Sequence, residues 1–189
     1  MSTDQIVPIA AGLSCFVAYA AGTVTVFRRD DRVTIGLVSL TLGAIAAGTT
    51  ELATMTHTPA PSAWHSAAGT AIFVGALALF LAAARETRRR PLTPAFSGDV
   101  PEHLVSTGPY RLVRHPFYTA YLLTYLAGWA VTGAPTLVVV CAGMTTLYAV
   151  AARQEERKFE HSPLARDYAR YAARTGMFWP AAGRQRADA

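Results

Sequence analysis

The stretch from Gly108 to Tyr118, GPYRLVRHPFY, places two arginines, a histidine, two tyrosines and two prolines directly before an apolar run. Pro116 suits the first turn of a helix, because its fixed φ matches helical geometry and its missing N–H is not needed there. We therefore expect a helix to begin near His115 and to continue into the apolar run. The start of that helix would present a positive dipole end, which favours an anionic group such as a carboxylate or phosphate.

The composition around this stretch is typical of a membrane protein. The chain has 189 residues, of which 52% are hydrophobic and 15% are charged, whereas soluble domains are about 25% charged. The apolar residues form blocks, and the basic residues behind the net charge of +5 lie between the blocks. This distribution predicts membrane lipids as partners. It does not favour nucleic acid, because it lacks the aromatic and basic interleaving that suits bases.

Five apolar segments predict membrane-spanning helices. They are Ile6–Phe27, Val33–Met55, Trp64–Ala84, Phe117–Val131 and Thr136–Ala152. The last two are short and are joined by a Gly-Ala-Pro turn, so we expect a helical hairpin at 117–152. The predicted fold class is all-α, a polytopic membrane helical bundle of about five transmembrane helices.

We predict a single membrane domain over residues 1–189, with two parts. Residues 1–90 would hold the three N-terminal transmembrane helices. Residues 91–180 would form the catalytic region, with the hairpin, a cytoplasmic cofactor-binding region and a C-terminal helix. The segment Pro91–Val113 is expected to be irregular, and Ser162-Pro163 predicts the start of the last helix, as N-cap and first-turn proline.

The distribution of basic residues predicts the orientation in the membrane. Arg28, Arg29 and Arg32 follow the first span and a cluster at 85–90 follows the third, whereas the loop after the second span has no Lys or Arg. Basic loops mark the cytoplasmic side. We therefore expect a multi-pass protein of the inner or plasma membrane with its N-terminus outside and its C-terminus and site in the cytoplasm. The first segment lacks the basic start of a signal peptide, so it should remain on the mature protein.

A few polar residues interrupt the apolar blocks. Glu51 lies near the end of the second span, and we expect its carboxylate to reach water at the interface. With His57 and His65 it matches no spacing of metal ligands, so no metal site is predicted. Cys15 and Cys141 lie inside apolar blocks, which predicts two buried free thiols without a disulfide.

The segment GPY-R-L-V-RHPFY, the hairpin, the pair Glu155-Glu156 and the later Asp167-Tyr168-Ala169-Arg170-Tyr171 together resemble the isoprenylcysteine carboxyl methyltransferase and phospholipid methyltransferase family. The resemblance covers roughly Leu104 to Pro180, and the N-terminal half is similar only as membrane helices. Members of this family are integral membrane enzymes that use S-adenosylmethionine and release S-adenosylhomocysteine. The resemblance implies methyl transfer to a lipophilic or small acceptor, with an isoprenylcysteine-type carboxylate as the favoured acceptor.

The resemblance also implies which residues contact the cofactor. These are Glu102, His103, Leu104, Val105, Gly108, Tyr110, His115, Pro116, Phe117, Tyr118 and Glu156. The family often has a histidine where Glu102 stands. The implied catalytic residues are Arg114, His115, Tyr118 and Arg153, the last as the arginine that precedes the glutamate pair on the acceptor side.

These residue types suit the chemistry of the cofactor. Glu156 can bind an α-amino group, and Arg114, His115 and the helix start can bind a carboxylate. Tyr110 and Tyr118 offer rings and hydroxyls to a sulfonium. We expect Glu155 to be a solvated partner of a basic residue on its own helix.

Other functions remain open at this point. A membrane NADPH-dependent reductase of the sterol type has a distantly similar C-terminal half, and a non-catalytic ligand sensor would keep the same cavity. Within the methyltransferases, a phospholipid amine or a thiol is the alternative acceptor. An amine or thiol would need a base, whereas a carboxylate is already ionised at neutral pH. The sequence does not determine the oligomeric state.

Overall fold

A computed structural model describes residues 2–25, 34–88 and 100–181 of the chain. This part folds into six α-helices and one short 3-10 helix. They are α1 (Thr3–Thr25), α2 (Ile35–His57), α3 (Ala63–Thr87), η1 (Gly108–Arg111), α4 (Pro116–Thr132), α5 (Pro135–Glu160) and α6 (Ala165–Arg174). The predicted loop at 28–32, much of the basic cluster and the segment 91–99 lie outside the described residues.

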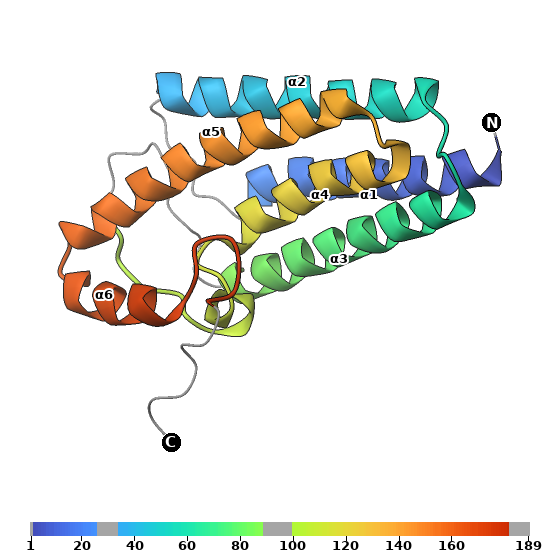
Figure 1. The fold of residues 1–189 in the computed structure, drawn as a ribbon. Coiled ribbons are helices and arrows are strands. Elements are labelled where there is room, and N and C mark those ends of the chain that lie inside the picture. Colours follow the sequence, from blue (N-terminus) through green and yellow to red (C-terminus); the bar gives the residue numbers. More distant parts are fainter. Residues whose placement is uncertain (1, 26–33, 89–99, 182–189) are drawn as a thin grey trace.

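The long helices form the predicted membrane bundle. The helices α1, α2, α3 and α5 are long and apolar enough to cross a membrane. The remaining helix of the five predicted spans, α4, has only 17 residues. It lies inside the bundle, where it packs mainly against α3 and also contacts α1, α2 and α5. The polytopic all-α fold class is therefore confirmed, with α4 as the buried element around which the others are arranged (Figure 1).

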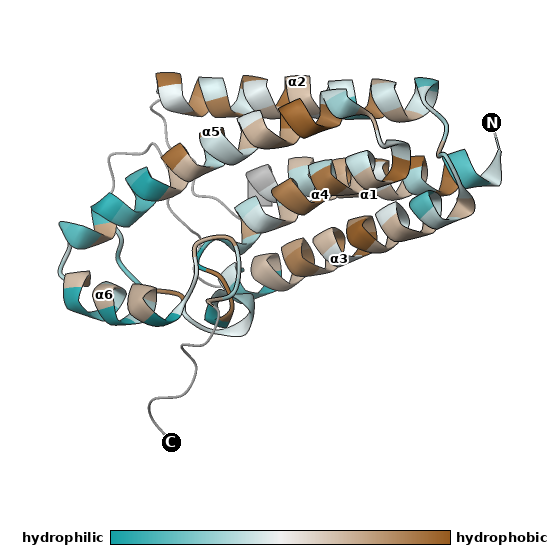
Figure 2. Ribbon diagram, viewed as in Figure 1, coloured by the Kyte–Doolittle hydropathy of each residue, from teal (hydrophilic) through white to brown (hydrophobic). Residues whose placement is uncertain are grey.

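The two ends of the bundle differ in polarity. The α2–α3 connection and the turn between α4 and α5 lie at one end, whereas η1, α6 and the end of α3 lie at the other (Figure 1). Hydrophobic residues fill the bundle, and hydrophilic residues gather on α6 and on the last turns of α5 (Figure 2). The polar end therefore projects from the membrane-spanning part of the bundle.

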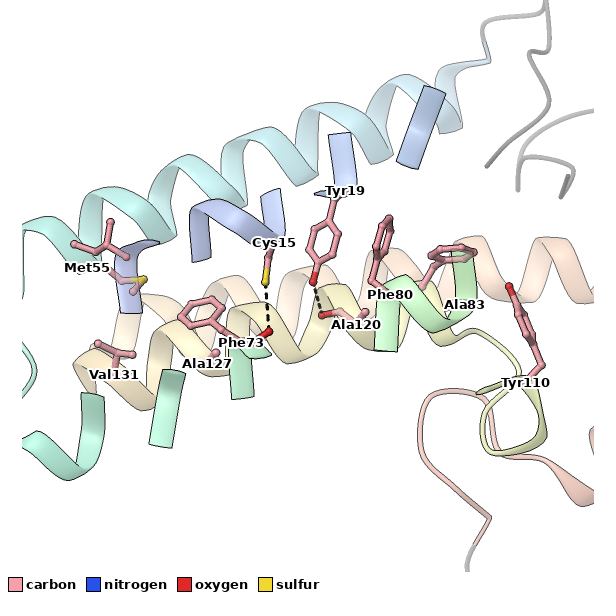
Figure 3. Close-up of a cluster of buried hydrophobic side chains, with 12 residues drawn as sticks. Cys15, Tyr19, Met55, Phe73, Phe80, Ala83, Tyr110, Ala120, Ala127 and Val131 are labelled. Carbon is pink, nitrogen blue, oxygen red and sulfur yellow. Dashed lines mark hydrogen bonds between the residues drawn. The ribbon is translucent and has the colours of Figure 1, made fainter. Parts of the chain in front are cut away.

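The core between α1, α3 and α4 combines aromatic rings with a few internal hydrogen bonds. The hydroxyl of Tyr19 lies 2.7 Å from the hydroxyl of Thr124 and 3.3 Å from the carbonyl oxygen of Ala120. The thiol of Cys15 donates to the carbonyl oxygen of Phe73 at 3.4 Å (Figure 3). Cys15 and Cys141 are both free thiols, as the sequence predicts, but only Cys15 is buried, whereas Cys141 is partly exposed. These bonds satisfy polar groups where no water is available.

Glu51 differs from the sequence-based expectation. Its side chain is fully buried in α2, so the prediction that it reaches water is wrong. Neither carboxyl oxygen has a hydrogen-bond partner among the described residues. A Cβ atom on Gly128 of α4 would lie only 2.2 Å from Oε1 of Glu51. The glycine therefore makes the space that the carboxyl group occupies inside the bundle.

The C-terminal helices also differ in detail from the prediction. The apolar arm of the hairpin and the polar segment after Arg153 form one continuous helix, α5. The last helix begins at Ala165, two residues after the expected start. Ser162 instead stabilises a turn, since its hydroxyl donates to the carbonyl oxygen of Phe159 and accepts from the N–H of Leu164. The predicted N-cap at Ser162 is wrong for this reason.

Candidate active site

The segment before α4 is held by backbone contacts with the end of the described chain. Pro116 is the first residue of α4 and His115 is its N-cap, as the sequence predicts. The N–H groups of Arg114 and His115 donate to the carbonyl oxygens of Gly176 and Met177, at 2.8 and 3.1 Å. The C-terminal segment therefore fixes the backbone from which the two side chains project.

The glutamate pair of α5 faces this segment. The Oε1 atom of Glu156 lies 2.8 Å from Nε of Arg114 and 3.0 Å from Nε2 of His115. The Oε2 atom of Glu155 lies 3.2 Å from Nδ1 of His115. The Tyr118 hydroxyl donates to Oε1 of Glu155 at 2.6 Å. Both glutamates therefore contact the RHPFY segment, and the expectation that Glu155 is a solvated partner on its own helix is wrong.

Arg114 has a second set of partners at the end of α6. Its Nη1 atom donates to the carbonyl oxygens of Ala172 and Thr175. Carbonyl groups at the last turn of a helix lack intrahelical partners and carry a partial negative charge, so a cation stabilises them. Arg114 thus joins α5 to α6, in addition to its place in the predicted site.

A cavity lies where the segment 101–105, the start of α4, the polar end of α5 and α6 meet. Its lining consists of Pro101, Glu102, His103, Leu104, Val105, Tyr110, Arg114, His115, Pro116, Phe117, Tyr118, Glu155, Glu156, Lys158, Phe159, Tyr168 and Tyr171. All the residues that we expected to contact a cofactor are in this set except Gly108. Of the predicted catalytic residues, only Arg153 is outside it.

The two exceptions have structural explanations. Gly108 has a φ of 56°, a backbone conformation that glycine adopts without strain. A Cβ atom there would lie 2.8 Å from Oε2 of Glu86, so the glycine allows η1 to approach the end of α3. Arg153 is exposed on α5. It is not among the residues that line the cavity.

Several lining residues were not predicted from the sequence. Glu155 was misjudged because adjacent helical residues usually face different directions, but His115 lies between the two glutamates and contacts both. Tyr168 and Tyr171 come from α6, whose contact with the cavity depends on long-range packing. The Tyr-x-x-Tyr spacing puts both rings on one helix face, which is the signal that could have identified them.

Two tyrosine hydroxyls in the cavity wall have no partner. The hydroxyl oxygens of Tyr110 and Tyr168 are buried without a hydrogen bond to the described residues. The hydroxyl of Tyr171, by contrast, donates to the carbonyl oxygen of Tyr110 at 2.7 Å. Leaving a buried hydroxyl unsatisfied costs about 1–3 kcal/mol. Both groups line one cavity, where a polar ligand or water can accept or donate their hydrogen bonds.

The electrostatics of the site centre on His115. Burial of the ring would by itself lower the pKa of His115, but the hydrogen bonds to Glu155 and Glu156 and their negative charges raise it above its ordinary value. Burial raises the pKa of Tyr168 and of Tyr171 far above the ordinary value for tyrosine. The tyrosines are therefore neutral hydroxyls, and the protonated form of His115 is favoured.

Aromatic rings cover the inner side of the charged cluster. The His115 ring is stacked on Tyr118, with ring centroids 5.6 Å apart, and Tyr118 is stacked on Tyr148 of α5 at 5.0 Å. Phe178 packs edge-on against both His115 and Tyr118. These ring contacts fix the positions of His115 and Tyr118, which both line the cavity.

The comparisons with known proteins assign the chain to a family. A model of the family described as "Phospholipid methyltransferase" matches residues 64–165, which is more than half of the chain. The chain belongs to this family. The match includes α3, although the sequence resemblance described above began only near Leu104. It ends before the tyrosines of α6. The fold and the family together place the chain among the helical membrane proteins of the phospholipid methyltransferase family.

One curated protein is similar over a shorter stretch. It is the cobalt-zinc-cadmium resistance protein CzcN of Cupriavidus metallidurans, 38% identical to this chain over 85 residues. The aligned part is 44% of this chain and 38% of that protein. The chain thus spans well under half the length of that relative. Within the described residues, no group of three His, Cys, Asp or Glu side chains is arranged to hold a metal ion.

Proposed function

We propose that the protein is an S-adenosylmethionine-dependent methyltransferase whose cofactor binds in the cavity between α4, α5 and α6. The observation that carries this proposal is the convergence of Glu156, His115 and the two unpartnered tyrosine hydroxyls on one cavity. The family match supports methyl transfer as the reaction class. The bound cofactor would supply an electrophilic methyl group on a sulfonium.

The lining suits the separate parts of this cofactor. Glu156 uses only Oε1 in its contacts with Arg114 and His115, and a carboxylate has a second oxygen with which to accept from an α-amino group. The aromatic ring of Phe159 lines the cavity, and aromatic rings favour a sulfonium or a planar base. The hydroxyls of Tyr110 and Tyr168 can hydrogen-bond to ribose, base or carboxylate. The residues present therefore fit the group.

The acceptor would come from the membrane or be a small molecule near its surface. The sequence resemblance favours an isoprenylcysteine-type carboxylate, and a phospholipid amine or a thiol is the alternative. In this proposal the cavity opens to the cytoplasm, and the N-terminus lies outside. Arg85 and Arg88, at the end of α3 near the cavity, support this orientation because basic residues favour the cytoplasmic side.

Calorimetric titration tests the proposal. S-adenosylhomocysteine and NADPH are each titrated into the purified protein, because NADPH binding is the property of the alternative reductase. We expect S-adenosylhomocysteine to bind and NADPH not to bind. The Glu156→Gln variant should lose binding at least tenfold, since a charge-assisted hydrogen bond contributes about 1.5–3 kcal/mol.

Glu160→Gln is the matched control, since Glu160 is exposed on the same helix and lies outside the cavity. Its affinity should equal that of the wild type. Binding of NADPH without S-adenosylhomocysteine would contradict the proposal and favour the reductase.

A further inference from the structure

His115 contacts a carboxylate with each of its ring nitrogens. Nδ1 lies 3.2 Å from Glu155 and Nε2 lies 3.0 Å from Glu156. A neutral imidazole has only one N–H group, so it could donate to one carboxylate and would face the other with a lone pair. The imidazolium donates to both. The geometry therefore favours a protonated His115 when the cavity holds no cationic ligand.

The charges in direct contact at this point are balanced. Two cations, Arg114 and protonated His115, are paired with two carboxylates, Glu155 and Glu156. Around them, Tyr118 of α4 donates to Glu155. The other titratable or charged groups that line the same cavity are Glu102 and His103 from the segment before η1, Tyr110 from η1, Lys158 from α5, and Tyr168 and Tyr171 from α6.

A third cation would upset this balance. Arg114 remains charged under all relevant conditions, and it is also fixed by the carbonyl groups of α6. His115 is the cation that can become neutral near physiological pH. An ammonium or sulfonium group placed beside Glu156 repels the imidazolium and competes with it for the same carboxylate.

We propose that binding of the cationic cofactor expels a proton from His115, and that the neutral His115 is then the base for the methyl acceptor. In this state Nδ1–H keeps its hydrogen bond to Glu155, which fixes the ring orientation. Nε2, released from Glu156, carries the free lone pair. This inference rests on the proposed function and assigns a role to a residue of the same site.

The proton balance of the reaction is complete under this proposal. A lone pair of the acceptor atom forms the bond to the methyl carbon, the carbon–sulfur bond breaks, and its electron pair stays on sulfur as the neutral thioether. The proton of the acceptor moves to Nε2 of His115. The imidazolium that existed before binding is thereby restored, and the net proton of the reaction is the one released to water on cofactor binding.

The acceptor class follows from this role. A base is needed by an acceptor that carries a proton on the atom to be methylated, such as a hydroxyl, a thiol or an ammonium group. A carboxylate carries no such proton. Together with the exposed position of Arg153, this favours a protonated acceptor over an isoprenylcysteine-type carboxylate.

Calorimetry in two buffers with different ionisation enthalpies measures the proton release directly. Near pH 6.5, the ordinary pKa of histidine, binding of S-adenosylmethionine without acceptor should release close to one proton. S-adenosylhomocysteine, which lacks the sulfonium charge, should release less. The His115→Gln variant should bind without proton release, and His161→Gln should behave as the wild type, because His161 is exposed at the end of α5.

The pH dependence of wild-type affinity gives a second measurement if His115→Gln does not fold. Proton release means that affinity rises with pH, by up to about tenfold per unit, until the free His115 has itself lost its proton. Binding enthalpies that do not depend on the buffer, a flat pH profile, or unchanged release in His115→Gln would each overturn the inference. Absence of any S-adenosylmethionine binding would instead overturn the proposed function.

Discussion

Two glutamates of the molecule, the buried Glu51 and the partly buried Glu156, lie in environments that differ in almost every respect. Glu51 lies among apolar helices, fully buried and without a hydrogen-bond partner among the described residues. Glu156 lies at the polar end of α5, where Arg114 and His115 both contact it. Close packing against Gly128 defines the first environment, and opposite charges define the second. The surroundings of each carboxyl group, and not its residue type, therefore determine how it contributes to the structure.

The largest loss of stability should come from removing a charged partner of Glu156. Replacing Arg114 with alanine removes the partner of Glu156 and the cation at the end of α6 together. Removing one partner of a buried ion pair costs about 3–5 kcal/mol, and we expect the lower part of this range because both side chains are slightly exposed. Thermal unfolding in detergent measures the loss.

The control for this change is Arg157→Ala, because Arg157 is exposed on α5 and is outside the cavity. Its unfolding midpoint should stay within error of the wild type. A similar midpoint for Arg114→Ala would mean that Arg114 does not stabilise the polar end of the molecule.

Overpacking next to Glu51 should destabilise the apolar part of the bundle. A Cβ atom on Gly128 would overlap Oε1 of Glu51, so Gly128→Ala should lower the free energy of unfolding by about 1–3 kcal/mol. The loss should largely disappear when Glu51→Ala is added, since the smaller side chain removes the overlap. Independent effects in the double-mutant cycle would contradict this contact. Gly143→Ala is the control, because nothing lies within 4 Å of a Cβ there.

Removing the hydroxyl should have a smaller effect on stability, and it should differ between the two neighbouring tyrosines of α6. Tyr171→Phe removes a hydrogen bond to the carbonyl oxygen of Tyr110, so it should cost about 1 kcal/mol of stability. Tyr168→Phe removes an unpartnered hydroxyl and should leave stability unchanged or slightly higher. It should instead weaken S-adenosylhomocysteine binding roughly three- to tenfold. Equal affinities of Tyr168→Phe and wild type would exclude this hydroxyl from ligand binding.

The smallest effect concerns the pH dependence of stability without ligand. The carboxylates raise the pKa of His115 in the folded protein. Their stabilising effect is thus complete below the ordinary pKa of histidine and is lost as the pH rises through the raised value. The thermal midpoint should therefore fall across this range in the wild type and in His161→Gln. His115→Gln should lack this component, and an unchanged pH dependence in that variant would contradict the assignment.

The sequence predicts the bundle well for a physical reason. A membrane-spanning helix must satisfy its backbone within the segment, so apolar length alone identifies it. Pro116 identifies the start of α4 because proline restricts the local backbone. Much of the cavity wall was also predicted, since the RHPFY segment and Glu156 carry the family resemblance. These signals are local in sequence, so they do not depend on contacts between distant parts of the chain.

The features that the sequence did not predict depend on contacts between distant segments. Glu155 reaches the site because His115, on another element, lies between the two glutamates. Glu51 is buried because Gly128 admits its carboxyl group, although its position near a helix end predicted exposure. Arg153 was expected in the site from the resemblance, but its side chain is exposed on α5 and does not line the cavity. For Glu155 and Glu51, the deciding partner lies far away in the chain.

The backbone contact between Val113 and Gly176 has a consequence for biosynthesis. The strandlike pairing that fixes Arg114 and His115 uses residues that follow every helix of the described chain. A nascent chain with all its long helices already inserted in the membrane therefore still lacks the segment that fixes the backbone of Arg114 and His115. The site can form only after translation has passed Phe178, so chains that stop earlier would integrate into the membrane without the contacts that hold Arg114 and His115 in place.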